Sequence, residues 1–531
     1  MTLGTYDYVV VGGGSAGCIV AAELARKLPD AKVLLLEAGD DAREHPETLV
    51  ADGYKDAFVN DALMHERFSV VDERWGKRRL FMGSGRGLGG SGSINAMVYT
   101  RGAELDFATW PKGWRWSDVA PAFERLESTL HPHKRDATDW AERCIAASER
   151  AGFRRSEDLN DGDLSGVLGY EWMSFEGKAR RSGFTAFLLP ALLECPNLTV
   201  VTNALVESLE MEGDRCVGVR WRGRGAHVVR PTQEVILCAG ALVTPALLQR
   251  SGVGSAKQLR KLGVDVVLDQ PEVGENLHDH PNVQLFYRGK HRTETYYPLL
   301  YGFHRARVRT DLPLAMSDTC YVFYPAVSSF REGLLRLLPG IALPPALYDR
   351  TSLPSVMRSG IAKAFEQPAV KEFVAKLWGI VVILGKPKSR GSVCIRSTDP
   401  TAPSAIDIGY FREREDLDVL LDGVEKARHV AQQSPLAEFG ARELVPGPMG
   451  LSRQGLARWA RKNVMTTYHY AGTCRMGDDA GAVVDPTTLK VRGLSNVRVA
   501  DASVMPWTPV SALNAPTMMI ALRAAETIAA G

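Results

Sequence analysis

The sequence has 531 residues, of which 45% are hydrophobic and 24% are charged, and its formal net charge is +2. This composition is that of an ordinary globular protein with room for two or more lobes, and it excludes a disordered or collagen-like chain. The nearly balanced charge gives no indication of a nucleic-acid partner.

The cysteine pattern and the N-terminal residues indicate in which cellular compartment we expect the protein. The eight cysteines are scattered without a C-x-x-C pair, so the sequence predicts neither a zinc site nor a dithiol centre. Scattered cysteines are typical of a reducing compartment. The chain enters its first strand after six residues without a basic leader, and it has no apolar run long enough to span a bilayer. We therefore expect a cytoplasmic protein.

The chain begins with a strand, a glycine turn and a helix. The apolar run 8–11 is typical of a buried parallel strand. Gly12, Gly14 and Gly17 follow at once and fit the pattern G-x-G-x-x-G, and apolar residues at helical spacing then predict a helix over 18–28. In such a unit the glycines allow a tight turn and close approach of a pyrophosphate to the helix N-terminus.

A second strand, predicted over 33–36, ends on Glu37, about 20 residues after Gly17. An acid at this point can accept hydrogen bonds from a ribose diol, and it disfavours the 2′-phosphate of NADP. Together with the glycine turn it predicts a dinucleotide site. The alternative is a glycine turn that serves only packing.

Strands and helices of the kind that build a nucleotide-binding sheet are also predicted in the middle and near the C-terminus of the chain. A glycine-dense stretch, 83–92, leads into an apolar segment, and a helical region with Trp110, Trp114 and Trp116 follows. Further strands and helices are predicted over 198–201, 217–221, 235–238, 244–250, 497–501 and 517–530. A sheet assembled from distant segments explains this order better than domains in series. We predict an α/β fold with a discontinuous Rossmann-like lobe, residues 1–109, 198–280 and 479–531, and a second lobe, residues 110–197 and 281–478.

The second lobe contains an apolar stretch with prolines and few acids, residues 330–384. We favour the interpretation that it forms the core and rim of this lobe. The alternatives are a wall for an apolar substrate and a patch that rests on a membrane surface, and the membrane patch is not favoured because exposed apolar patches are less usual.

Several blocks together resemble the glucose–methanol–choline (GMC) oxidoreductase family of flavoproteins. The blocks are the N-terminal motif, 85–95, 240–254, 468–477 with 501–506 and Asn514, and the smaller matches 273–280 and 387–391. They run in family order and cover nearly the whole chain. The resemblance implies a second lobe with an antiparallel sheet and helices that forms the roof of the site.

The resemblance also implies FAD as the dinucleotide, with its ADP half on the N-terminal motif. The residues implied to bind FAD are Gly12, Gly14, Gly17, Glu37, Arg86, Gly90, Ser91, Asn95, Ala96, Val206, Asp501, Ala502, Asn514 and Thr517. Some members attach FAD through a histidine just before the asparagine of the second block. Here that position is Ile94, so we predict non-covalent FAD.

By the same resemblance, His469 matches the catalytic histidine and Asn514 the second active-site residue. A histidine suits the base that takes the hydroxyl proton of an alcohol while a hydride leaves for the flavin. Tyr470 stands where a proline is common and Gly92 where a serine is common. His278 and His280 could be read as metal ligands, but no further ligands cluster near them, so we predict no metal site.

The sequence thus predicts FAD-dependent oxidation of a small-molecule alcohol, with a lean toward a primary aliphatic or aromatic one. The electron acceptor is either oxygen or a quinone-like molecule, and neither it nor the oligomeric state is decided by the sequence. The alternative on the same scaffold is a non-redox lyase or a light-driven fatty acid decarboxylase. A flavin-containing binding protein and, more weakly, an NAD dehydrogenase also remain open.

Overall fold

The first of two large sheets is built around the predicted N-terminal unit. The computed structural model describes residues 4–293 and 295–531. Within them, parallel pairing runs in the order β12, β2, β1, β15, β26, and the first half of β15 pairs antiparallel with β14, which pairs with β13. The strands are β1 (Thr5–Val11), β2 (Val33–Leu36), β12 (Leu198–Val201), β13 (Leu205–Glu212), β14 (Arg215–Arg222), β15 (Ala226–Leu237) and β26 (Val497–Val499).

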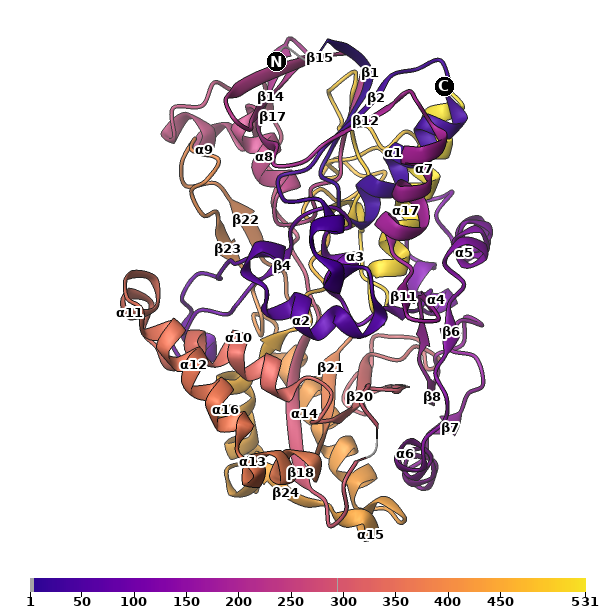
Figure 1. Ribbon diagram of the computed structural model, residues 1–531, viewed down its shortest axis with the longest axis vertical. Coiled ribbons are helices and arrows are strands. Elements are labelled where there is room, and N and C mark those ends of the chain that lie inside the picture. Colours follow the sequence, from indigo (N-terminus) through magenta and orange to yellow (C-terminus); the bar gives the residue numbers. More distant parts are fainter. Residues whose placement is uncertain (1–3, 294) are drawn as a thin grey trace.

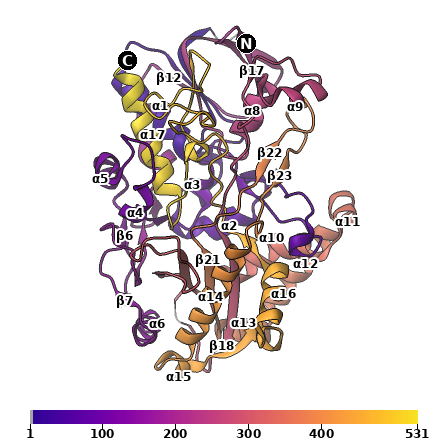
Figure 2. The same cartoon turned by 180° about the vertical axis from the view of Figure 1, so that it is seen from behind.

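Two helices from opposite ends of the chain pack against each other beside this sheet, α1 (Ser15–Lys27) and α17 (Asn514–Ala529). Both begin three residues before their predicted starts. Gly14 is the extended N-cap of α1, so the glycine turn leads directly into the helix. In α17, Pro516 lies in the first turn, where a missing N–H costs no hydrogen bond. Figures 1 and 2 place this lobe at one end of the long axis.

The core of this lobe also includes helices from the inserted segment. Helix α5 (Trp116–Leu130) buries Phe123 and Leu126 in the same cluster as β1 and α1, and a π-helical turn (Gly183–Leu188) with α7 (Leu189–Glu194) joins that cluster through Phe184. Trp110 and Trp114 are buried there as well. The division of the chain at residues 110 and 197 remains a prediction, because these helices share the core of the first sheet.

The second sheet is almost entirely antiparallel. Its strands run in the order β24, β18, β21, β20, β19, β8, β7, with β25 beside β18, and β7 and β8 are the parallel pair. The strands are β7 (Arg154–Arg155), β8 (Val167–Tyr170), β18 (Pro281–Arg288), β19 (Leu300–His304), β20 (Thr319–Pro325), β21 (Leu377–Leu384), β24 (Arg442–Val445) and β25 (Met465–Thr466). These two sheets confirm the predicted α/β architecture.

Helix α14 (Arg414–Ala431) packs on one face of the second sheet and shares its core with α6 (Asp139–Arg150) and α16 (Arg453–Asn463). Four helices lie between β20 and β21 in the chain, namely α10 (Phe330–Ala342), α11 (Pro345–Arg350), α12 (Leu353–Glu366) and α13 (Pro368–Ala375). They project to one side of the molecule in Figure 1. No helix among the described residues is long and apolar enough to cross a membrane.

Shorter elements connect these layers. The helices are α2 (Tyr54–Val59), α3 (Ser91–Ile94), α4 (Glu104–Phe107), α8 (Thr244–Arg250), α9 (Ala256–Lys261) and α15 (Leu436–Gly440). The strands are β3 (Met64–His65), β4 (Ser84–Gly85), β5 (Val98–Tyr99), β6 (His133–Lys134), β9 (Trp172–Met173), β10 (Phe175–Glu176), β11 (Ala179–Arg180), β16 (Val253–Gly254), β17 (Leu268–Asp269), β22 (Ser392–Cys394) and β23 (Ala405–Asp407). Among them, β3 pairs with β4, and β5 pairs with β9.

Candidate functional site

A cavity of about 1360 Å³ connects the first sheet to the second. Its lining includes Glu37, directly after β2, and Val206, near the start of β13. It also includes His469 and Asn282, which lies in β18 of the second sheet. The predicted site residues that line it are Gly12, Gly14, Glu37, Arg86, Gly90, Ser91, Asn95, Ala96, Val206, His469, Asp501, Ala502, Asn514 and Thr517. Gly17 lies outside the lining, in the first turn of α1.

The three motif glycines have different surroundings. Gly12 has φ +96°, a left-handed conformation that favours glycine. A Cβ on Gly17 would lie 1.8 Å from the carbonyl oxygen of Gly12, so Gly17 allows the helix to pack on the turn. A Cβ on Gly14 would meet nothing within 4 Å, so this glycine borders open space on the cavity. That open space is where the motif predicts a pyrophosphate.

The Glu37 side chain accepts hydrogen bonds from three backbone segments that meet at the C-terminal end of β2. Its carboxylate accepts hydrogen bonds from the N–H groups of Gly13 (2.7 Å), Gly39 (2.8 Å) and Gly87 (3.0 Å). Burial raises the pKa of this carboxyl, and the three N–H donors act against that rise. Two oxygens offer about four acceptor positions, so one remains for a ribose hydroxyl. The acid therefore has a structural role beyond the predicted one.

The segment that includes Ser91 and Asn95 is held by a buried arginine that sequence reasoning did not find. The Arg180 guanidinium donates to the carbonyl of Gly92 (3.1 Å) and to both the side-chain oxygen (2.9 Å) and the carbonyl (2.7 Å) of Asn95. Arg180 is 1% exposed, and burial lowers its pKa to about 9. No local sequence signal marks this role, since Arg180 lies 85 residues from Asn95.

Asp501 fixes a second backbone turn at the cavity. One carboxylate oxygen accepts from the Gly240 N–H (2.8 Å) and the Thr244 hydroxyl (2.6 Å), and the other accepts from the Ser503 N–H (2.8 Å) and hydroxyl (2.6 Å). These four bonds saturate the side chain. Asp501 thus shapes the cavity wall, and the adjacent Ala502 accepts a backbone bond from Gly472, three residues after His469.

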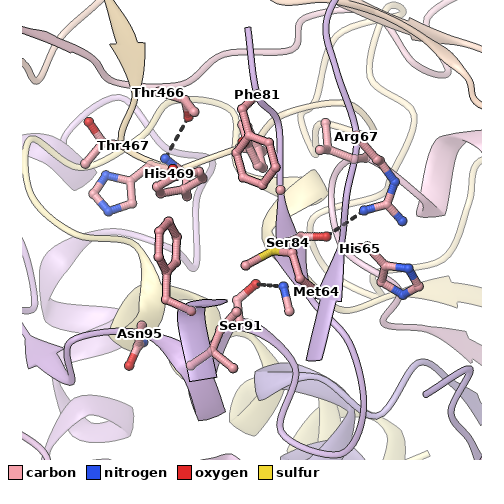
Figure 3. A pocket seen from close by; sticks show the side chains of 18 of the residues that line it. Met64, His65, Arg67, Phe81, Ser84, Ser91, Asn95, Thr466, Thr467 and His469 are labelled. Atoms are coloured by element: carbon pink, nitrogen blue, oxygen red, sulfur yellow. Dashed lines mark hydrogen bonds between the residues drawn. The ribbon is translucent and has the colours of Figure 1, made fainter. Parts of the chain in front are cut away.

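These residues fit FAD. The cavity extends without interruption from the ribose-type acid Glu37 to His469, and the glycine turn leaves room for a pyrophosphate between them. Ser91, Ile94 and Asn95 also line this cavity. Figure 3 shows His469 on one side of this space and His65 and Arg67 on the other, with Ser91 and Asn95 nearby.

His469 lies in a loop that Asp279 holds in place. The His469 N–H donates to one Asp279 oxygen at 2.7 Å, while the hydroxyls of Thr466 and Tyr410 donate to the other. Tyr468, the residue before His469, has φ +63°, which is unusual for a tyrosine and turns the chain into the cavity. Burial raises the pKa of Asp279 to about 6 and lowers that of His469 to about 4.

A second histidine contacts His469, and it was missed as a functional residue. The Nδ1 atoms of His280 and His469 are 2.9 Å apart, and the His280 Nε2 lies 3.0 Å from the Thr508 hydroxyl. His280 is fully buried, and burial together with the nearby His469 holds its pKa well below the usual range. The quoted block 273–280 contained this residue, but sequence reasoning weighed it only as a metal ligand.

Asn514 lines the cavity and contacts the start of α1. Its side-chain oxygen accepts from the Ser15 hydroxyl at 2.9 Å, and its amide nitrogen is 4.0 Å from the Met518 sulfur. Within residues 4–293 and 295–531, it has no hydrogen bond to His469. Ser15 begins α1 directly after the glycine turn, so Asn514 lies beside the predicted pyrophosphate site, and both its cofactor-binding and its catalytic role stay predictions.

The cavity continues from His469 along an apolar wall. Helix α10 contributes Phe330, Leu334, Leu337, Leu338 and Ile341 to the lining, and β21 is buried in the core of the second lobe. Within the stretch 330–384, β21 therefore belongs to the core and α10 to the cavity wall, while α11, α12 and α13 add no residue to the lining. No group of three or more metal-ligating side chains occurs among the described residues, and His278 instead contacts the Asn276 carbonyl at 2.8 Å.

Comparison with known proteins identifies the family. Profiles described as GMC oxidoreductase match residues 6–282 and 387–521. An oxygen-dependent choline dehydrogenase from Chromohalobacter salexigens is 32% identical over 98% of this chain and 94% of its own length, and an alcohol dehydrogenase [acceptor] from Pseudomonas putida is 33% identical over 98% and 95%.

Two solved structures have folds similar to that of this chain. Pyridoxine 4-oxidase from Mesorbium loti superposes with a TM-score of 0.83 at 26% identity, covering 98% of this chain and 99% of that one. A fungal aryl-alcohol oxidase superposes with a TM-score of 0.74 at 22% identity over 99% of both chains. The chain belongs to the GMC oxidoreductase family of FAD-dependent enzymes.

Proposed function

We propose that this enzyme oxidises an alcohol, with His469 as the base that takes the hydroxyl proton. The observation that carries the proposal is the position of His469: it lines the same cavity as Glu37, and its Nδ1 lies 2.9 Å from the Nδ1 of His280. Its other ring nitrogen, Nε2, has no hydrogen-bond partner among the described residues. That nitrogen is therefore free to meet a substrate hydroxyl.

The proposed role of His469 requires one of the two tautomers that its contact with His280 allows. Both rings are neutral near pH 7, because burial lowers both pKa values. If the His469 Nδ1–H donates to His280 Nδ1, then His469 Nε2 bears a lone pair and can act as a base. The opposite tautomer would place a proton on Nε2 and leave no base. His280 then donates through Nε2 to the Thr508 hydroxyl, which completes the base-competent arrangement.

When bound, FAD supplies the hydride acceptor. The chain's own residues orient the substrate and exclude water. Phe81 and the inner face of α10 give the cavity apolar sides. This lining supports a primary aliphatic or aromatic alcohol as the substrate. The names of the relatives, choline dehydrogenase and alcohol dehydrogenase [acceptor], also support an alcohol.

Several finer points belong to this proposal. Ile94 has no nucleophilic atom for attachment, which supports non-covalent FAD. The electron acceptor is oxygen or a quinone-like molecule. A cytoplasmic location stays a prediction, which is based on the eight cysteines that form no disulfide. A membrane contact through α10–α13 is not favoured, although Ile341 and Val356 on these helices are exposed.

The experiment is anaerobic mixing of the yellow holoenzyme with a panel of primary alcohols while the flavin absorbance is recorded. Bleaching by an alcohol supports the proposal, and the rate at which colour returns in air separates an oxidase from a dehydrogenase. No bleaching by any alcohol would contradict it. Product formation from a cyanohydrin or an illuminated fatty acid would then favour the lyase or decarboxylase alternative.

A further inference from the structure

One buried acid that lines the cavity makes no side-chain contact that stabilises the fold, and it has no part in the proposed chemistry. Glu171 connects β8 to β9, is 3% exposed and lines the cavity. Its side chain has no hydrogen bond or ion pair with any described residue, and its Oε2 is buried without a partner. An unpartnered buried carboxyl is costly, because water no longer solvates it and no protein donor replaces the water.

The surroundings of Glu171 place it beside the predicted flavin segment. Its N–H donates to the Leu299 carbonyl at 2.8 Å, at the start of β19. The next two residues, Trp172 and Met173, pair with β5, which continues the segment 91–95 that is predicted to run along the flavin. Glu171 therefore lies where the second sheet meets that segment, in the part of the cavity between the two lobes.

Among residues 4–293 and 295–531, no cationic side chain forms an ion pair with Glu171. Burial alone raises the pKa of Glu171 to about 8, with no cationic group acting against the rise. The neighbouring side chains that also line the cavity are Val98, Pro298 and Tyr301. A ligand that brings its own positive charge would supply the missing partner, and an aromatic ring such as that of Tyr301 suits a cation as well.

We propose that Glu171 binds a protonated nitrogen of the substrate, so that the preferred substrates are amino alcohols whose hydroxyl reaches His469. This inference rests on the proposed alcohol oxidation and adds a charged group to the apolar alcohol expected from the rest of the lining. The tryptophans at 110 and 114 do not contribute to such a site, because they are buried in the core of the first lobe.

The test compares 4-aminobutan-1-ol with pentan-1-ol, which have the same number of heavy atoms and differ in a terminal ammonium against a methyl group. The wild-type holoenzyme should prefer the amino alcohol in kcat/KM. Glu171→Gln should lose this preference mainly through KM, by roughly 100-fold or more, the scale of removing one partner of a buried charge pair. Glu171→Asp should retain part of it. The control is Glu176→Gln, the same change at an exposed position on β10.

A binding measurement separates this inference from the proposed function. Pentylammonium carries no hydroxyl, so its affinity can be measured by calorimetry without turnover. Weaker binding of pentylammonium to Glu171→Gln than to wild type and Glu176→Gln supports the inference even if no alcohol reduces the flavin. Equal affinities in all three proteins would overturn it, and so would a Glu171→Gln variant that keeps FAD and the wild-type preference for the amino alcohol.

Discussion

His280 and His469 meet through their Nδ1 atoms at 2.9 Å, although 189 residues separate them in the chain. His280 directly precedes β18 of the second sheet, and His469 follows β25, which pairs with the start of β18. The antiparallel pairing of these strands is therefore what brings the two rings together. A hydrogen bond between these two atoms requires one ring to donate from Nδ1 and the other to accept there.

Changing His280 tests that arrangement. His280→Leu removes the acceptor for the His469 Nδ1–H, so flavin reduction should slow by roughly tenfold or more, a part of the 10²–10⁴-fold that a positioned base contributes. His280→Asn places an amide near Nδ1 and should recover much of the rate. Rapid-mixing absorbance under anaerobic conditions measures both. If leucine and asparagine give the same rate with FAD fully bound, His280 does not position the base.

The pH dependence of flavin reduction follows from burial of the base. The pKa of His469 is lowered to about 4, so the ring is unprotonated and competent throughout the neutral range. The rate should be flat above about pH 6 and fall to about half of its plateau at pH 4, where about half of the His469 rings are protonated. A profile from pH 4 to pH 9 checks this. A break near pH 7 that disappears in His280→Leu would instead mean that the pair shares a proton at neutral pH.

Arg180 should be required for FAD binding without touching the substrate. In Arg180→Met, the Gly92 and Asn95 carbonyls lose their buried donors, each at a cost of about 1–3 kcal/mol. We expect FAD affinity to fall by more than tenfold, measured by quenching of flavin fluorescence during titration. Lys178→Met, on the same hairpin but exposed, is the control. Equal affinities in the two variants would contradict the role given to Arg180.

Glu171→Gln should make the protein more stable as well as less selective. Its pKa is about 8 in the folded protein against 4.5 for a free glutamate, so ionisation in the unfolded chain favours unfolding between these values. The gain from glutamine should be absent near pH 4, grow with rising pH and level off above pH 8, reaching a few kcal/mol. Thermal unfolding at pH 5, 7 and 9 measures it. A gain independent of pH would mean that Glu171 is not held uncharged.

The fold was predictable to the extent that its signals are local. Gly12, Gly17 and Glu37 could be singled out from the sequence because they lie in one strand–helix–strand segment, where their spacing is a known pattern. The family resemblance added the order of the blocks and pointed to His469. Both helices next to the turn start three residues earlier than predicted, because Gly14 and Pro516 belong to the helix starts rather than to the preceding loops.

The rest of the site depends on contacts between distant segments. Arg180 reaches the predicted flavin segment from the hairpin of β10 and β11, and Glu171 draws attention only because no side chain in the described part of the chain pairs with it. His280 stood in a quoted block, yet no spacing rule relates it to a histidine in another part of the chain. Asn514 was matched by motif, and only the fold places its side chain beside Ser15.

Single-turnover reduction of the bound flavin by an alcohol, compared between wild type and His469→Ala, tests the central claim most directly. The account predicts that His469→Ala remains yellow, binds FAD as wild type does, and is reduced at least about 10²-fold more slowly. Reduction of the two proteins at the same rate would contradict the assignment of His469 as the base.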